Sequence, residues 1–339
     1  MGVALKTTVG VGIMGIGYNS SESTRTIYPS VIDMMTTQGL TSTKAFSLYL
    51  NDLQASTGSI LFGGVDTAKY SGNLIGLPIQ PDVQTGGINS FTVALSGVSA
   101  TGSAGNTTTF PATSLPAAVV LDSGTTLTYL PPALTSAIYT QFNVNDQTTR
   151  LGEAIIDCAY RNSGITLNYS FGGTGGPTIK VDMNELVFTY AISRGVEICA
   201  FGIQSSGTSG LNLLGDTFLR SAYVVYDISA NQVALAQTVF NVTTSNLQEI
   251  TPSGIPLVSG IATSATVRAT GTQKPGVGVR TTVSNGQTIV VTQTAAATSS
   301  RAAGSHVAIP RFEWSGLAVL GLASVVAMVG GAVFVNAAL

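Results

Sequence analysis

One stretch of the sequence places a carboxylate among hydroxyl groups at the end of an apolar run. Residues 117–121 are apolar, and Asp122, Ser123, Gly124 and Thr125 follow them directly. The run predicts a buried strand that delivers the carboxylate of Asp122 to a tight turn. The hydroxyl groups can donate hydrogen bonds to that carboxylate, and the glycine lets the backbone approach closely. A carboxylate surrounded by donors is held ionised and oriented, which acid–base chemistry on water requires.

A structural interpretation of the same residues is an Asx turn that closes a hairpin. The histidine content narrows the chemical alternatives. The sequence has one histidine, His306, in a segment that we expect to lie outside the folded domain. A Ser-His-Asp or Cys-His arrangement and a histidine-ligated zinc site are therefore excluded. Any hydrolysis must depend on carboxylates.

The composition predicts a mostly β protein. The 339 residues suffice for two domains, only 9% are charged, and short apolar runs rich in Val, Ile and Thr are cut by Gly and Pro. The net charge of −2 and the lack of a basic cluster exclude a nucleic-acid partner. The two cysteines, Cys158 and Cys199, favour one disulfide over a metal site, with two buried free thiols as the alternative.

The Asp122 turn and a later segment, Asn212-Leu-Leu-Gly-Asp216, together resemble the second lobe of pepsin-like aspartic proteases. In that family an Asp-(Thr/Ser)-Gly turn carries one of two catalytic acids, and an apolar-apolar-Gly segment crosses behind it. Segments at 45–50 and 58–66 resemble the family in the same order. The resemblance covers roughly residues 10 to 237 and implies an all-β, pepsin-like bilobal fold.

Carried over residue by residue, the resemblance makes Asp122 a catalytic acid. Ser123 would brace the active-site turn against the other lobe, and Gly124 and Thr125 would supply the turn and hydrogen bonds near the carboxylate. The family needs no cofactor and no metal. The resemblance also implies a disulfide between the two cysteines. Asp216 is expected to cap a short helix that begins at residue 217, and Asp227 to begin the turn of a closing hairpin.

The family mechanism uses two aspartates that share one proton, because two adjacent carboxylates cannot both ionise. This sequence contains one Asp-(Thr/Ser)-Gly, at Asp122. Asp33, Asp52 and Asp66 lie in contexts that fit helix, loop and turn roles. We therefore expect an N-terminally truncated aspartic protease, whose first catalytic Asp motif and flap would precede Met1.

Four segments are expected along the chain. Residues 1–73 are a remnant of the N-terminal lobe with the interdomain strands, and residues 74–242 are a complete C-terminal lobe. Within them we expect helices near 28–35 and 131–142 and a polar loop at 100–109. Residues 243–305 have the composition of a disordered Ser/Thr-rich stalk, with a hint of β structure at 288–291.

The C-terminal residues 306–339 fit a glycosylphosphatidylinositol (GPI) anchor signal. Small residues at 303–305 precede a polar spacer and an apolar tail that ends without Lys or Arg. Gly304 is the candidate attachment residue, and the pattern resembles fungal yapsin-type surface proteases. Candidate N-glycosylation sites agree with passage through the secretory pathway: Asn19, Asn106, Asn168 and Asn241. We expect a monomer on the extracellular face of the plasma membrane or in the cell wall.

Three functional hypotheses follow. The first is an aspartic-type endopeptidase that hydrolyses secreted or cell-surface proteins through an Asp pair, of which this chain supplies only Asp122. The alternative is a catalytically inactive GPI-anchored glycoprotein with a binding or wall-structural role. In a third, two copies of the chain pair and donate one Asp122 each. The expected partners are protein or peptide substrates and, through the anchor, the membrane.

Overall fold

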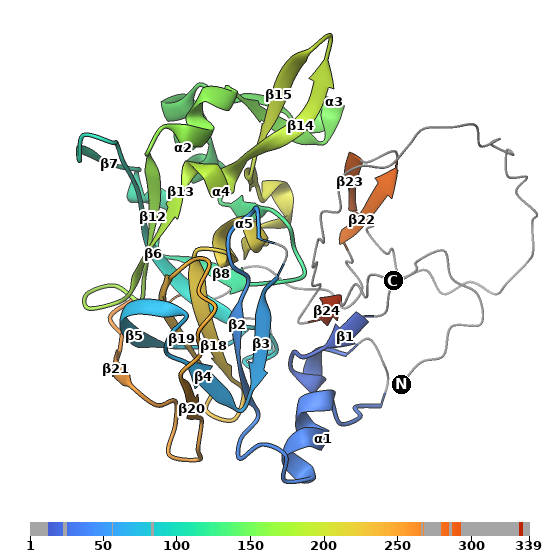
Figure 1. Ribbon diagram of the computed structural model, residues 1–339, viewed down its shortest axis with the longest axis vertical. Coiled ribbons are helices and arrows are strands. Elements are labelled where there is room, and N and C mark those ends of the chain that lie inside the picture. Colours follow the sequence, from blue (N-terminus) through green and yellow to red (C-terminus); the bar gives the residue numbers. More distant parts are fainter. Residues whose placement is uncertain are drawn as a thin grey trace, which may run out of the picture.

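The computed structural model is built mainly from strands, with five short α-helices among the described residues (Figure 1). It describes residues 13–22, 26–55, 57–82, 85–265 and 267, and the strand segments 279–284, 287–292 and 332–334. A sheet that carries both early and late strands lies on one side, and the sheets of the second lobe lie on the other (Figure 1). Strand β8 (Ala117–Leu121) and helix α5 (Asp216–Leu219) lie where these layers meet (Figure 1).

The joining sheet has the strand order β21-β5-β19-β18-β2-β3. Its strands are β2 (Ala45–Tyr49), β3 (Ser59–Phe62), β5 (Tyr70–Pro78), β18 (Ala222–Asp227), β19 (Gln232–Thr238) and β21 (Val258–Ile261). β2 pairs antiparallel with β18, so that Leu48 lies opposite Val224. The expected strands at 45–50 and 58–66 are confirmed as β2, β3 and β4 (Gly64–Asp66). Strands from much later in the chain hold them in place, because β18 pairs with β2 and β20 (Leu247–Glu249) pairs with β4.

The largest sheet carries the candidate site and has the order β13-β12-β6-β8-β17-β9-β16, with β7 paired to β6. Its strands are β6 (Thr92–Thr101), β7 (Thr107–Thr109), β8 (Ala117–Leu121), β9 (Thr128–Leu130), β12 (Thr166–Phe171), β13 (Thr178–Asp182), β16 (Ile203–Ser205) and β17 (Leu213–Leu214). The expected loop at 100–109 is wrong, because β6 runs to Thr101 and β7 pairs back on it. Threonine is a good strand residue, which lets this polar stretch form a hairpin.

A four-stranded sheet packs with the largest sheet. It contains β10 (Asn145–Gln147), β11 (Glu153–Ile156), β15 (Val196–Phe201) and β14 (Val187–Ser193), in that order.

The helices are α1 (Val31–Thr37), α2 (Pro132–Phe142), α3 (Thr148–Leu151), α4 (Met183–Leu186) and α5 (Asp216–Leu219). No helix of the described residues is long and apolar enough to cross a membrane.

The two expected longer helices are present. α1 begins later than the expected residue 28, because Ser30 and Asp33 form a capping box that fixes its start. α2 begins with Pro132 in its first turn and ends at Asn143, which adopts a left-handed conformation. Its buried face consists of Leu134, Thr135, Ile138 and Phe142.

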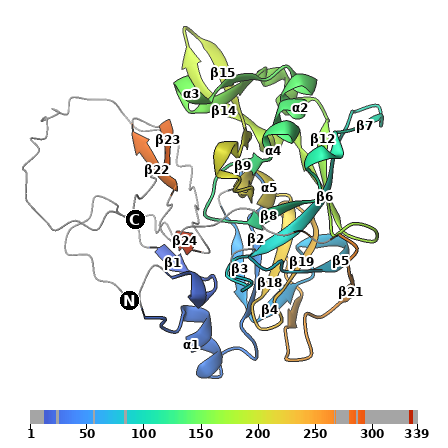
Figure 2. The same ribbon diagram turned by 180° about the vertical axis from the view of Figure 1, so that it is seen from behind.

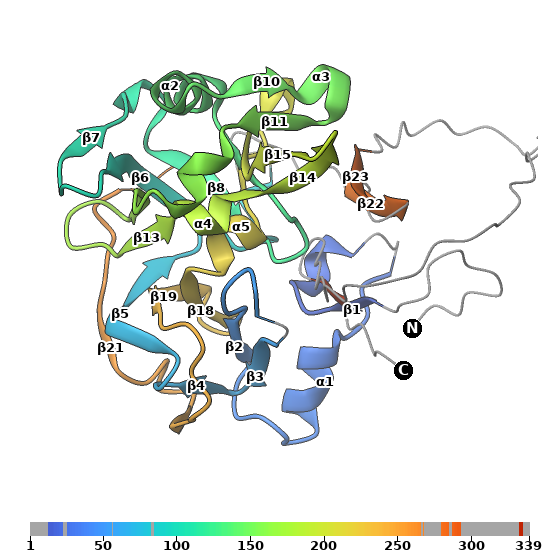
Figure 3. The ribbon, with the colours of Figure 1, turned by 45° about the horizontal axis from the view of Figure 1, so that its top comes forward.

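Residues 246–265 form a strap that packs on the joining sheet and then on the second lobe. Within it, β20 (Leu247–Glu249) pairs with β4, and β21 lies beside β5 (Figure 3). Ile250 is 0% exposed, and Ala262 is buried against the second lobe. Packed structure therefore continues past residue 243, where we expected a disordered stalk to begin.

Further along, β22 (Val279–Ser284) and β23 (Gln287–Thr292) form a hairpin at the hint of β structure around 288–291. β1 (Ile13–Gly15) pairs with β24 (Ala332–Phe334). The expected attachment residue Gly304 and the rest of the predicted anchor signal lie outside the described residues.

Candidate active site

Strand β8 delivers Asp122 to a buried turn, as the sequence predicts. Asp122 is 6% exposed. Its Oδ1 accepts a hydrogen bond from the backbone N–H of Gly124 at 2.9 Å, and Oδ2 accepts one from Oγ1 of Thr125 at 2.8 Å. These donors favour the ionised carboxylate and fix its orientation.

The segment that contains β17 crosses directly behind this turn. The N–H of Asp122 donates to the carbonyl of Leu214 at 3.1 Å, while β17 pairs parallel with β8 and antiparallel with β9. A Cβ atom at Gly215 would lie 2.1 Å from the carbonyl oxygen of Thr125 and 2.4 Å from that of Leu127. Glycine is therefore required for this close approach, which holds the turn from behind.

The remaining predicted turn residues are also buried. Ser123 is 6% exposed and Thr125 is 4% exposed. The brace between Ser123 and another lobe stays a prediction. Chemically, the turn offers one oriented carboxylate that can accept a proton from water, and it resembles half of a paired-carboxylate site.

Four acids have the structural roles that the sequence predicts for them: Asp33, Asp52, Asp66 and Asp227. Asp33 belongs to the α1 capping box, and its carboxylate pairs with Nζ of Lys44 at 2.7 Å. Burial acts to raise the pKa of Asp33, but the contact with Lys44 contributes to lowering this pKa below the usual range. Asp52 accepts from the N–H of Gln54, and Asp66 accepts from the N–H of Ala68. Asp227 accepts from the N–H of Ala230 in the hairpin turn between β18 and β19.

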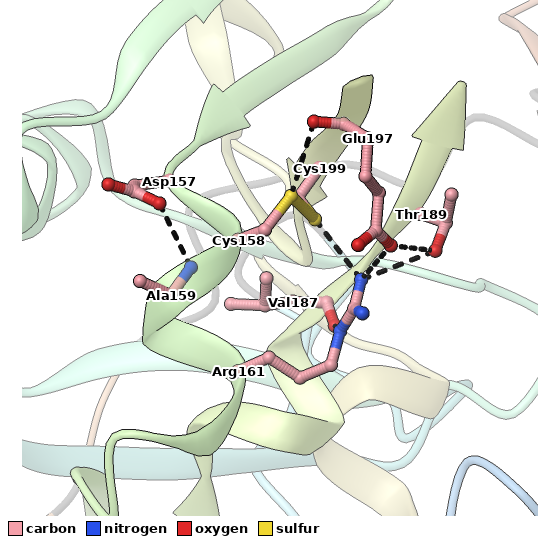
Figure 4. The surroundings of a disulfide bond; sticks show 8 residues. All are labelled: Asp157, Cys158, Ala159, Arg161, Val187, Thr189, Glu197 and Cys199. Atoms are coloured by element: carbon pink, nitrogen blue, oxygen red, sulfur yellow. Dashed lines mark hydrogen bonds and ion pairs between the residues drawn. A yellow bond between two sulfur atoms is a disulfide. The ribbon is translucent and has the colours of Figure 1, made fainter. Parts of the chain in front are cut away.

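Cys158 and Cys199 form a disulfide in the second lobe (Figure 4), with Cα atoms 5.3 Å apart. Arg161 lies across the bridge, where its guanidinium donates to Sγ of Cys199 at 3.1 Å and to Glu197 at 2.8 Å (Figure 4). The hydrogen bonds that Glu197 accepts from Arg161 and Thr189 lower the pKa of its exposed carboxyl group. The cysteines are joined to each other, so they do not offer metal-binding thiolates.

The four sequon asparagines differ in accessibility. Asn106 is exposed in the turn between β6 and β7. Asn168 is 8% exposed, and its Nδ2 donates to Oγ of Ser99 and Oγ1 of Thr101 inside the sheet. Asn19 and Asn241 bind the carboxylates of Asp33 and Asp52, respectively, through Nδ2. The fold therefore favours Asn106 and disfavours Asn168 as a glycan acceptor.

Asp216 does not cap α5, contrary to expectation. The cap position is Gly215, no side chain caps the helix, and Asp216 itself is the first helical residue. Its side chain is buried, and burial raises its pKa well above the ordinary value, with a further contribution from the charge of Asp122. The sequence contains one sign that Asp216 lies near Asp122. Asp216 directly follows Gly215, the glycine of the segment that crosses behind the Asp122 turn.

Glu153 is a second buried acid that sequence reasoning missed. It is 5% exposed at the start of β11, and its Oε2 accepts from Nε2 of Gln204 at 3.1 Å. Burial raises the pKa of Glu153 to about 7, although the Gln204 hydrogen bond acts in the opposite direction. In the sequence it is an ordinary acid after a glycine, and no local pattern marks it as buried.

Three features define a pepsin-like aspartic protease fold: the mostly β architecture, the turn at Asp122, and the segment that crosses behind this turn. Residues 3–238 match the family model described as eukaryotic aspartyl protease. The chain belongs to this family.

Curated relatives agree with that assignment. A probable aspartic-type endopeptidase opsB of Aspergillus fumigatus is 41% identical over 77% of this chain and 54% of its own length. Aspartic proteinase 3 of Saccharomyces cerevisiae is 33% identical over 74% of this chain and 44% of its own length. Secreted aspartic protease 3 of Candida albicans is 36% identical over 72% of this chain and 56% of its own length. The chain spans about half the length of the curated relatives that it matches.

Among solved structures, an aspartic proteinase from Irpex lacteus superposes with a TM-score of 0.53 at 23% sequence identity. The match covers 69% of each chain. At this identity the likeness supports the fold, and the chemistry must be argued from the site.

Proposed function

We propose that the protein is an aspartic-type endopeptidase and that Asp122 is one of its two catalytic acids. The observation that carries this proposal is the buried Asp122 carboxylate, which accepts hydrogen bonds from Gly124 and Thr125. The ionised carboxylate would accept a proton from a water molecule as the water oxygen attacks the carbonyl carbon of a peptide bond. A second, protonated acid would donate to the carbonyl oxygen.

The second acid is proposed to come from a first-lobe segment that carries its own Asp-(Thr/Ser)-Gly. Asp33, Asp52 and Asp66 are engaged in a helix cap, a loop and a turn, so none is suited to this role. Two copies of the chain that each supply Asp122 are the less favoured arrangement. In that case residues 45–66, which include strands β2 and β3 of the joining sheet, would have to leave the pairing surface free.

The domain organisation is proposed to be a first-lobe remnant at 1–73, a second lobe from residue 74, and the strap. We further propose that the protein acts on secreted or cell-surface proteins. Relatives named as secreted aspartic proteases support an extracellular site of action. A GPI anchor at or near Gly304 would hold the protein at the cell surface, and the composition of residues 303–339 supports it.

The test is a cleavage assay on the protein as the cell makes it, after the mature N-terminal peptide has been sequenced. A quenched fluorescent peptide library at acidic to neutral pH is incubated with the wild type, with Asp122→Asn, and with Asp146→Asn as an exposed control. We expect pepstatin-sensitive cleavage that Asp122→Asn reduces by at least about 10²-fold and that the control retains. Cleavage that survives Asp122→Asn would reject the proposal.

The alternative function is an inactive surface glycoprotein that uses the second lobe for binding or wall structure. It is favoured by the presence of one Asp-(Thr/Ser)-Gly in the sequence. A mature N-terminus near Met1, together with correctly folded protein that cleaves no peptide, would support this alternative.

A further inference from the structure

The hairpin formed by β14 and β15 projects from the second lobe and forms one end of the longest axis of the molecule (Figure 1). Seen from behind, its tip again extends beyond the elements around it (Figure 2). Ser193 pairs with Val196 across a two-residue turn, in which Arg194 and Gly195 have positive φ angles of 52° and 80°. Such a turn matches the twist of the two strands. The tip is therefore held in a defined place away from the core.

The tip exposes large apolar side chains to solvent. Ile192 is 72% exposed and Val196 is 65% exposed, and they flank the same turn. The Oη of Tyr190 donates to the carbonyl of Leu151 at 3.3 Å, which places α3 beside the hairpin. Leu151 is itself 40% exposed, so α3 adds a third apolar side chain near the tip. Contact between these side chains and water is unfavourable, and a less polar environment would relieve it.

The charges around these side chains are positive. Arg194 lies in the hairpin turn and Arg150 lies in α3; both are exposed, and neither forms an ion pair with an acid of the described residues. The acid next along β15, Glu197, is already paired with Arg161 at 2.8 Å. Residues 187–196 contain no acid. The tip therefore carries two uncompensated positive charges in a chain whose net charge is −2.

Exposed apolar side chains and unpaired arginines at one projecting end are the features of a membrane-docking surface. We propose that this hairpin tip docks on the surface of an anionic phospholipid bilayer, through Ile192, Val196, Leu151, Arg150 and Arg194. The apolar side chains would enter between the headgroups, and the guanidinium groups would bind the lipid phosphates. Charge complementarity favours an anionic surface. A bilayer can accept a few protruding side chains, whereas a stable protein partner needs a broad complementary surface.

Docking at the tip would orient the folded domain. The hairpin and α1 lie toward opposite ends of the long axis (Figure 1), so the bilayer would contact the second lobe and leave the α1 end away from the lipid. The proposed GPI anchor would hold the protein near the bilayer without fixing this orientation. The docking proposal goes beyond the proposed proteolysis and does not depend on it.

The experiment places a fluorescent reporter at the tip of the full-length protein. An environment-sensitive nitrobenzoxadiazole group is attached to Ser193→Cys, since the two natural cysteines are joined in a disulfide. The control carries the same group at Ser259→Cys, which is exposed on β21. Vesicles of phosphatidylcholine, with or without phosphatidylserine, are then added. With phosphatidylserine we expect the emission at residue 193 to shift to shorter wavelength and to rise at least about twofold, while the emission at residue 259 stays unchanged.

Two double variants of the labelled protein test the two kinds of side chain. Ile192→Ser with Val196→Ser should remove most of the response at residue 193, and so should Arg150→Gln with Arg194→Gln. Matched controls change the same kinds of exposed side chain elsewhere and should retain the response: Leu40→Ser, at a side chain that is 67% exposed, and Lys180→Gln, on β13.

A reporter at residue 193 that does not respond, whether or not the protein binds the vesicles, would overturn the proposal. An equal response to phosphatidylcholine alone would reject the role of the arginines. Because β14 is the edge strand of its sheet, a second copy of the chain is the competing occupant. A response that grows with protein concentration in the absence of vesicles would show that pairing and overturn membrane docking. None of these outcomes depends on peptide cleavage.

Discussion

At the scale of single residues, the surroundings of each carboxyl group determine where its proton is held. Asp122 receives two hydrogen bonds in its turn and is suited to carry charge. Glu153 is at least as inaccessible, but it receives one amide hydrogen bond, from Gln204, and burial dominates its titration. Buried acids with different hydrogen-bonding surroundings therefore occur in the same lobe.

Glu153 should make the protein less stable as the pH rises from acidic to neutral. Its pKa is about 7 in the folded protein against an ordinary value of 4.5. The folded state therefore binds more protons than the unfolded state between these values, so stability is greatest below pH 4.5 and falls as the pH approaches 7. The total effect is about 3 kcal/mol. Urea unfolding at a series of pH values should show a shallower fall for Glu153→Gln than for the wild type.

Glu249→Gln is the matched control, because Glu249 is exposed on β20. It should reproduce the wild-type dependence of unfolding free energy on pH. An identical fall in the wild type and in Glu153→Gln would show that Glu153 is not protonated by burial.

The two kinds of acid also differ in how far the sequence predicts them. The Asp122 turn is local: a run of apolar residues, a carboxylate and three small residues lie together in the chain. The environments of Glu153 and Asp216 depend on chain segments far away, such as Gln204 for Glu153 and Asp122 for Asp216. No local pattern contains that information, so their burial could be found only in the fold.

At the scale of elements, the strap formed by residues 246–265 extends the packed structure beyond the expected boundary. The helix at 132–142 is predictable because two prolines mark its start and its apolar residues have helical spacing. The strap has single buried residues, Ile250, Ile255 and Ala262, at irregular intervals. Each is buried by a neighbouring sheet, so the segment has no periodicity of its own and its composition resembles that of a stalk.

Removing the side chain of Ile250 should destabilise the protein although it lies in the expected stalk. Ile250 is 0% exposed and packs with Val65 and Tyr223 in the smaller core. We expect Ile250→Ala to lower the free energy of unfolding by about 2–5 kcal/mol, as is usual for a large-to-small change in a core. Thermal or urea unfolding measures this. Leu247→Ala, which changes a side chain that is 60% exposed on the same strap, is the control.

Equal stability of Ile250→Ala and Leu247→Ala would show that the strap does not contribute to the folded domain. The folded unit would then end near the boundary that the sequence predicts, at residue 242.

At the scale of the whole molecule, the joining sheet makes the early strands and the second lobe one structural unit. β2 pairs with β18, β5 pairs with β19, and the strap adds β21 at the edge. The rings of Phe46 on β2, Phe91 before β6 and Tyr226 on β18 meet beneath this sheet. Residues separated by about half the chain therefore share one core. This core reaches the candidate site, because the carbonyl of Phe91 accepts a hydrogen bond from the N–H of Leu121, the residue before Asp122, at 3.1 Å.

Phe46→Ala should consequently affect the candidate site although Phe46 lies far from it in sequence. The loss of a buried ring should lower the free energy of unfolding by about 3–5 kcal/mol. Because the core is shared, hydrogen exchange should become faster both in peptides from β2 and β3 and in the peptide that contains the Asp122 turn. Ile192→Ala, whose side chain is 72% exposed on β14, should leave exchange in both regions unchanged. Faster exchange confined to β2 and β3 would instead mean that the early strands open independently, and the active-site turn would then be supported by the second lobe alone.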